Sequence, residues 1–114
     1  MAARNAKIQI EVDLDEQQIP EKILWTSLDQ GPQNQQEAKA ILISFFDKDS
    51  LDTMKLDLWT KEMQVMEMDR FMFHTLNAMA DTYRNATNNS KLANDFKSFA
   101  NYFGEQIQNN QDPS

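Results

Sequence analysis

The spacing of apolar residues changes once along this chain, and that change constrains the fold more than any other feature. Before residue 60, apolar and polar side chains alternate one by one, as on a β-strand with one wet face. From Val65 onward, apolar residues recur every three or four positions, which is the period of an α-helix. A run of strands followed by a run of helices predicts the α+β class.

The first half is predicted to hold four strands. The alternation is clearest in the first of them, and the polar segment 29–36, with Gly31-Pro32, separates the second strand from the third. The third strand is apolar over part of its length, which is typical of burial on both faces. The third and fourth strands are expected to form a hairpin. The four segments are 8–14, 22–28, 38–46 and 54–59.

The second half is predicted to hold two helices, one over 65–86 and one from 88–90 to 108. In the first helix the apolar arc covers roughly 240°, against about 100° or somewhat more in an ordinary surface helix. Such a helix must contact two surfaces, which we expect to be the sheet and the second helix. The second helix is apolar on one side only, and Gly104 falls on its polar side.

The expected fold is therefore a four-stranded antiparallel sheet followed by two C-terminal helices packed on one face. The 114 residues suit a single α+β domain, which we place at 7–108. The segments 1–6 and 109–114 are predicted to be flexible termini.

Composition and charge exclude several classes of function. The chain has no Cys and one His, which excludes disulfide scaffolds, thiol catalysis and His-rich metal sites. The net charge of −7 argues against nucleic acid and anionic membranes as partners. Acidic residues exceed basic ones in every third of the chain, so the excess is expected to be a solvated surface and not a docking tail.

Targeting signals are absent from the sequence as given. No apolar stretch follows Lys7 as it would in a signal peptide. No run approaches the ~18 apolar residues that a membrane-spanning helix needs. Together with the lack of Cys, these observations predict a cytoplasmic location without membrane insertion.

No constellation in the sequence supports catalysis, and no cofactor or metal ion is expected. His74 has no carboxylate at helical spacing close enough to orient it, so a surface histidine is the expected role. Asp47, Asp49 and Asp52 imitate the start of a calcium-binding loop, but position six of that loop is Asp52 where a Gly is needed. An ordinary hairpin turn is expected there.

Trp59 is the first candidate for an interaction surface. It lies on the opposite face of its strand from the three apolar residues Met54, Leu56 and Leu58. If those three face the helices, Trp59 faces outward or pairs across the sheet with an aromatic residue such as Phe45 or Phe46.

Met66 and Phe73 are the second and third candidates, because they lie at the edge of the apolar arc of the first helix. If the second helix does not cover them, they form an exposed apolar patch of the kind that marks interfaces. The chain has seven Met, which fit either core filling or an adaptable binding groove. A sheet with aromatic residues on its outer face also suggests association with a second copy of the chain.

The order of particular residues resembles the GldC family of gliding motility proteins from Bacteroidetes. The resemblance covers about residues 7–105. It rests on Pro20-Glu-Lys-Ile-Leu-Trp25, Ala38-Lys-Ala-Ile-Leu-Ile-Ser-Phe-Phe-Asp47, Asp57-Leu-Trp-Thr-Lys61, Met63, Glu67-Met68, Phe71, His74-Thr-Leu76, Met79-Ala80, Thr82 and Ala86-Thr-Asn88. Gln64 and Met66 differ from the family pattern, in which a proline and an acidic residue are expected.

The resemblance implies a small accessory or adaptor protein of the gliding machinery that is not an enzyme and acts by protein–protein interaction. Its implied partners are proteins of the gliding or envelope machinery. The alternative function is a chaperone, or a holder of unfolded or exported chains, because strands followed by two helices in an acidic chain are similar to the SecB architecture.

Overall fold

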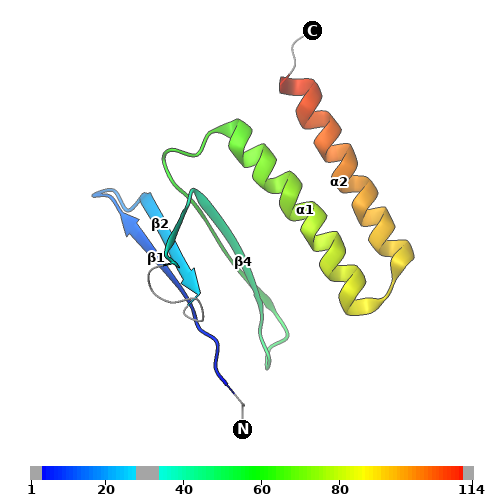
Figure 1. Cartoon of the computed structure of the whole chain (residues 1–114), viewed down its shortest axis with the longest axis horizontal. Helices are drawn as coiled ribbons and strands as arrows, with labels where there is room; N and C mark the ends of the chain where they lie inside the picture. Colours follow the sequence, from blue (N-terminus) through cyan, green and yellow to red (C-terminus); the bar gives the residue numbers. More distant parts are fainter. Residues whose placement is uncertain (1–3, 28–33, 112–114) are drawn as a thin grey trace. The chain divides into compact units, whose positions relative to one another are not determined.

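The computed structural model describes residues 4–27 and 34–111. The chain divides into two compact units, Met1–Met63 and Gln64–Ser114, and each is described by itself. The first unit holds the strands and the second holds two helices, which confirms the α+β class (Figure 1). The single domain over 7–108 and the packing of both helices on one face of a sheet stay predictions.

The prediction of one four-stranded sheet is wrong. The described residues form five strands in two antiparallel sheets, one with the order β1-β2-β3 and one made of β4 and β5. The expected loop at 29–36 lies largely outside the described residues. The strands are β1 at Ile8–Leu14, β2 at Pro20–Ser27, β3 at Gln36–Ala38, β4 at Ala40–Phe46 and β5 at Thr53–Trp59.

The sheet divides because the expected strand 38–46 is interrupted at Lys39. Ala38 ends β3, which pairs with β2, and Ala40 begins β4, which pairs with β5. Lys39 lies in a bend between them, and its carbonyl accepts the N–H of Thr60 at 2.8 Å. The chain therefore changes its pairing partner within one apolar run.

The three-stranded sheet holds the buried centre of the first unit. Ile23 of β2 is fully buried, and its direct partners are Val12 of β1 and Ala38 of β3. Direct partners in an antiparallel ladder share a face, so the three apolar side chains lie side by side. The β1–β2 pairing shifts its register between Asp13 and Leu14, where β1 leads into its turn.

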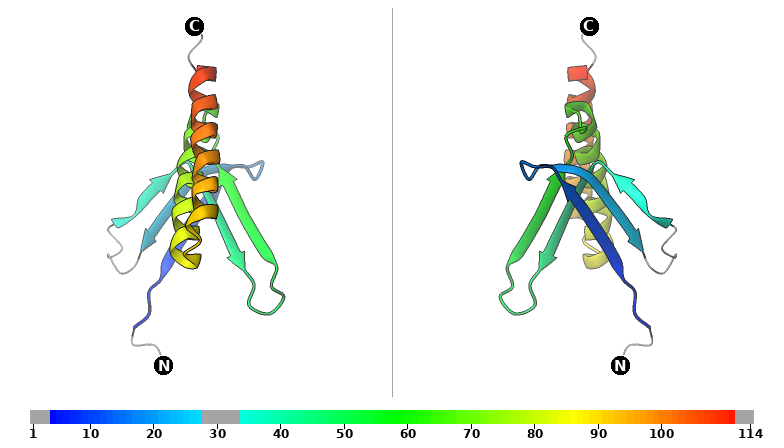
Figure 2. Two further views of the ribbon diagram at one scale, coloured as in Figure 1. Left: turned by 90° about the vertical axis from the view of Figure 1, so that its right-hand side faces the viewer. Right: turned by 90° about the vertical axis from the view of Figure 1, so that its left-hand side faces the viewer.

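The second unit is an antiparallel pair of helices, α1 at Val65–Thr87 and α2 at Ser90–Gln111 (Figures 1 and 2). Both predicted helices are confirmed, and α2 continues beyond the expected end at 108. At the start of α1, the Gln64 N–H donates to Glu67 Oε1 at 3.1 Å, so a glutamate on the first turn caps the helix.

The link between the helices uses two asparagines. Asn88 adopts the left-handed conformation (φ 60°) that commonly ends a helix, and its N–H donates to the Arg84 carbonyl. Asn89 Oδ1 then accepts the N–H of Leu92 at 3.0 Å, which caps the start of α2. The expected start of the second helix at 88–90 is confirmed.

Small residues form the contact between α1 and α2. Ala80, Ala93 and Ala100 are fully buried. Gly104 belongs to the same contact, and its expected place on the polar side of α2 is wrong: a Cβ at Gly104 would lie 2.5 Å from Cε1 of Phe73. The glycine is therefore needed for close approach of the Phe73 ring.

Gly104→Ala is expected to lower the stability of the chain, although alanine favours a helix over glycine by about 1 kcal/mol. The added methyl group must displace the Phe73 ring, and overpacking of this kind costs ~1–3 kcal/mol. Urea unfolding measures the change. In a Phe73→Ala background the clash is absent, so there the same substitution should raise stability by about 1 kcal/mol.

Equal effects of Gly104→Ala in the two backgrounds would contradict the contact between Gly104 and Phe73.

Candidate protein-binding surface

One face of the β4–β5 hairpin is wholly apolar. In its register, Ile41 pairs with Leu58, Ile43 with Leu56, and Phe45 with Met54. Each pair lies on one face, and successive pairs two residues apart lie on the same face. We call these six side chains the hairpin face: Ile41, Ile43, Phe45, Met54, Leu56 and Leu58.

The hairpin face is open to solvent toward the tip of the hairpin. Phe45 is 59% exposed, Met54 65% and Leu56 44%, while the others are half-buried. Soluble monomers rarely expose contiguous apolar patches larger than a few hundred Å². A two-stranded sheet is also marginally stable in water unless another layer covers its apolar face. The hairpin face is therefore an exposed apolar surface of the kind that marks interfaces.

The opposite face of the hairpin is mixed in character. Lys55 Nζ and Asp57 Oδ2 form an exposed ion pair there at 3.7 Å. Trp59 lies on the same face and is 53% exposed. Its cross-strand partner is Ala40, so Trp59 does not pair with Phe45 or Phe46, which was one of the two alternatives that the sequence left open.

The two helical candidates are placed differently. Met66 is 58% exposed on the first turn of α1. Phe73 is half-buried and lies against Gly104, so α2 covers one side of its ring. Phe73 belongs to the helix–helix contact, and Trp59 and Met66 lie in different units of the chain.

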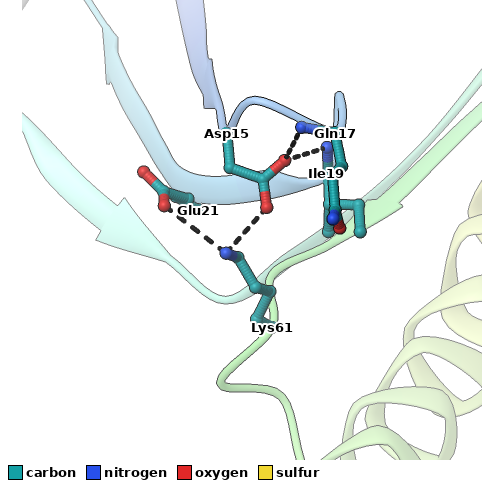
Figure 3. Close-up of polar contacts among 5 residues, drawn as sticks. All are labelled: Asp15, Gln17, Ile19, Glu21 and Lys61. Atoms are coloured by element: carbon teal, nitrogen blue, oxygen red, sulfur yellow. Dashed lines mark hydrogen bonds and ion pairs between the residues drawn. The ribbon is translucent and has the colours of Figure 1, made fainter.

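An ion pair anchors the base of the hairpin to the turn between β1 and β2 (Figure 3). Lys61 follows β5, and its Nζ lies 2.7 Å from Asp15 Oδ2 and 3.4 Å from Glu21 Oε1. The Lys61 N–H also donates to the Pro20 carbonyl at 3.3 Å. These contacts join the two sheets at the end of the hairpin remote from its tip.

Asp15 also shapes its own turn. Its Oδ1 accepts the N–H of Gln17 at 2.7 Å and that of Ile19 at 2.9 Å. The hydrogen bond from Lys61, and next the one from Ile19, hold the pKa of Asp15 below its ordinary value of 3.8. The same pairing raises the pKa of Lys61 above 10.5.

An open depression of about 560 Å³ lies beside this ion pair. Its lining includes three carboxylates and one ammonium group, and the ammonium already pairs with two of the carboxylates. The lining residues are Leu14, Asp15, Glu16, Gln17, Glu21 and Lys61. The lining contains no His, Ser or Thr.

The Asp15–Lys61 pair makes stability depend on acid. Because the folded-state pKa of Asp15 is lowered, its contribution is present above about pH 4 and is lost as pH falls through the folded-state pKa. Asp15→Asn should therefore lower stability at pH 7 and flatten its decline below pH 4. Thermal unfolding from pH 7 to pH 2 measures both effects.

Asp47→Asn serves as the control. Hydrogen bonds from the Ser50 backbone and side chain lower the pKa of Asp47, so this variant should also lose part of the acid dependence. Lys61→Met is then added to each variant. It should leave the stability of Asp15→Asn nearly unchanged, because Lys61 has already lost its nearest partner there, and it should lower the stability of Asp47→Asn. A full effect of Lys61→Met in both backgrounds would show that the ion pair does not anchor the hairpin.

His74 is exposed, and its ring centroid lies 5.4 Å from that of Phe73. Within residues 4–27 and 34–111, no group of three or more His, Cys, Asp or Glu is arranged to hold a metal ion. Neither of the two described helices has the length and apolar content needed to cross a membrane.

Sequence reasoning chose Trp59, Met66 and Phe73 and missed the hairpin face. The signal for that face was the alternation Met54, Leu56, Leu58, which sequence reasoning used only to place Trp59 on the other face. The pairing of each of these residues with an apolar residue of β4 is seen only in the register of the hairpin.

Comparison with known proteins gives one match. A family model described as gliding motility-associated protein GldC-like matches residues 20–109. This stretch includes β2 to β5, α1 and nearly all of α2. None of the curated proteins and none of the solved structures gives a significant match.

Proposed function

Because the chain belongs to the GldC-like family of gliding motility-associated proteins, we propose that it serves gliding as a non-enzymatic accessory protein that binds a protein partner through the hairpin face. The exposure of that face supports the proposal. Three of its six apolar side chains are exposed by 44% or more, on a sheet that has only two strands.

The chemistry of the hairpin face indicates the kind of partner. The face contains no charged or hydrogen-bonding side chain, so it favours an apolar surface of similar width. The chain around it carries a net charge of −7, which repels other polyanions. A protein of the gliding or envelope machinery with an apolar patch and a basic rim meets both conditions, since complementary rim charges raise the rate of association.

The helical unit is a weaker candidate for this role. Val65 and Met79 of α1 are 79% and 48% exposed, and Phe99 of α2 is 56% exposed. The exposed apolar residues lie at separate places along the two helices, such as Val65 and Met66 at the start of α1 and the stacked rings of Phe99 and Tyr102 on α2. The hairpin face differs because its six members are direct or adjacent partners in one ladder.

A chaperone-like holder of unfolded chains is the second candidate. The observation that favours it is the spread of exposed large apolar residues over both units, since a holder binds many sequences through several apolar surfaces. Binding to a reduced, unfolded protein distinguishes the candidates. The accessory protein should ignore such a client, whereas the holder should bind it with stoichiometry near one.

Met54→Asp is expected to abolish partner binding. Met54 is the most exposed member of the hairpin face, so a charge there should be tolerated by the fold and costly in an apolar interface. A tagged chain expressed in its gliding host recovers the partner, and quantitative binding should weaken at least ~10-fold, which corresponds to about 1.4 kcal/mol. Gliding of cells that carry only the variant should be impaired.

Thr53→Asp is the matched control. Thr53 is the neighbouring residue in β5, also exposed, and it lies on the opposite face. It should keep both binding and gliding. If Met54→Asp unfolds the chain, the hairpin face is part of the core. If Met54→Asp binds the partner as tightly as Thr53→Asp does, the partner binds elsewhere. Either result would overturn the proposal.

A further inference from the structure

The outer edge of β4 is an unprotected strand edge. Within the described part of the chain, β4 pairs with β5 and with no other strand. Its seven residues, Ala-Ile-Leu-Ile-Ser-Phe-Phe, contain no charge, no Pro and no Gly. Natural proteins guard such edges with charged side chains, proline, bulges or very short strands, because an open edge is a template for pairing with another chain.

The other open edges among the described strands carry these guards. β5 presents Lys55 and Asp57 along its edge, and β1 carries Glu11 and Asp13 together with a shift of register. β3 has only three residues, one of them Glu37. The unguarded edge of β4 is therefore exceptional in this structure.

The hydrogen bonds of the hairpin show which backbone groups face this edge. The N–H of Asp47 donates to the Asp52 carbonyl at 2.8 Å, and the N–H of Thr60 donates to the Lys39 carbonyl at 2.8 Å. Residues that bond to one neighbouring strand alternate along a strand, so the odd-numbered residues of β4 bond to β5. The N–H and C=O groups of the even-numbered residues point to the open edge: Ala40, Leu42, Ser44 and Phe46.

We propose that the occupant of this edge is a second copy of the chain, with β4 pairing antiparallel to β4 of the second copy about a two-fold axis at Ile43. This register uses all four outward-facing residues of each strand. Leu42 of one copy bonds to Ser44 of the other, and Ala40 bonds to Phe46. The inference goes beyond the proposed function and stands independently of the identity of the gliding partner.

The side chains are complementary in this register. Ile41 lies opposite Phe45 of the second copy on the apolar face, and on the other face the small Ala40 lies opposite the large Phe46. Just beyond the strand ends, Lys39 lies opposite Asp47 of the second copy, so opposite charges meet at both ends of the ladder. Two chains of net charge −7 thus meet along their uncharged strands.

The assembly closes at two copies. Pairing produces the four-stranded order β5-β4-β4-β5, in which the unguarded edge is consumed and both remaining edges carry Lys55 and Asp57. The hairpin face becomes twice as large, and a sheet of four strands is stable where one of two strands is marginal. A dimer is therefore expected, not a filament.

A single cysteine tests both the pairing and its register. The chain has no Cys, so any disulfide comes from the introduced residue. Two Cys at position 43 would face each other across the axis as a non-hydrogen-bonded pair, with Cα atoms ~4.5 Å apart, within reach of a disulfide. Ile43→Cys should cross-link into a covalent dimer under mild oxidation.

Leu56→Cys is the matched control, since Leu56 is the direct partner of Ile43 and lies on the same face. In the proposed sheet the two copies of residue 56 are separated by three strand spacings, ~14 Å, so they should not cross-link. Equal cross-linking of both variants would indicate face-to-face stacking and overturn the edge pairing.

Light scattering of the chain without substitutions provides the second measurement. It should give the mass of a dimer. Ser44→Pro removes an outward N–H and leaves the bonds to β5 in place, so it should weaken dimerisation at least ~10-fold, whereas Ser44→Ala should not. A monomer at high concentration, a species that grows without limit, or equal behaviour of the two Ser44 variants would overturn the proposal.

Discussion

A sheet of two strands cannot bury the apolar side chains on its own faces, and this limit governs the structure. β4 and β5 place six apolar residues on one face, with Phe45, Met54 and Leu56 exposed. The three-stranded sheet buries an apolar side chain at its centre, since Ile23 is fully buried between apolar partners. The two-stranded hairpin has no central strand whose side chains could be buried in this way. Both proposals therefore concern the hairpin: a protein partner binds its apolar face, and a second copy of the chain pairs with its edge.

The hairpin forms a separate sheet because of the short segments at its base. Lys39 bends the chain so that β3 and β4 pair with different strands, and the Thr60 N–H bonds to the Lys39 carbonyl. Lys61 then joins this base to Asp15 in the β1–β2 turn at 2.7 Å. The base is thus held by charge-assisted contacts, while the turn at the tip is held by hydrogen bonds from the Asp49 and Ser50 N–H groups to Asp47 Oδ2.

Periodicity predicted both helices and most of the strands, and it failed where the chain changes its pairing partner. The limits of α1 and the alternation of β1 followed from side-chain spacing, whereas the three-residue β3, which begins at the polar Gln36, was not predicted. The division at Lys39 did not follow from spacing, because an apolar run gives no sign of which strand it pairs with. Gly104 was assigned to the polar side of α2 because a glycine shows its role only when the neighbouring helix is in place. The same limit hid the hairpin face, whose alternation is identical whether it is covered or exposed.

The net charge of the chain and the uncharged strand β4 have complementary roles in the proposed dimer. In the proposed dimer, two chains of net charge −7 meet along β4, which carries no charge. The chain belongs to the GldC-like family of gliding motility-associated proteins. In the proposed dimer, the charged residues at the two remaining edges limit the assembly to two copies.

Amide hydrogen exchange along β4, followed by NMR, shows whether a second copy of the chain pairs with this strand. Amides of Ile41 and Ile43 bond to β5, whereas those of Leu42 and Ser44 face the open edge. If a second copy pairs with β4, all four amides exchange slowly, and Leu42 and Ser44 lose their protection as the protein is diluted. Protection that alternates along β4 at every concentration, with Leu42 and Ser44 exchanging at the rate of free amides, would contradict pairing with a second copy.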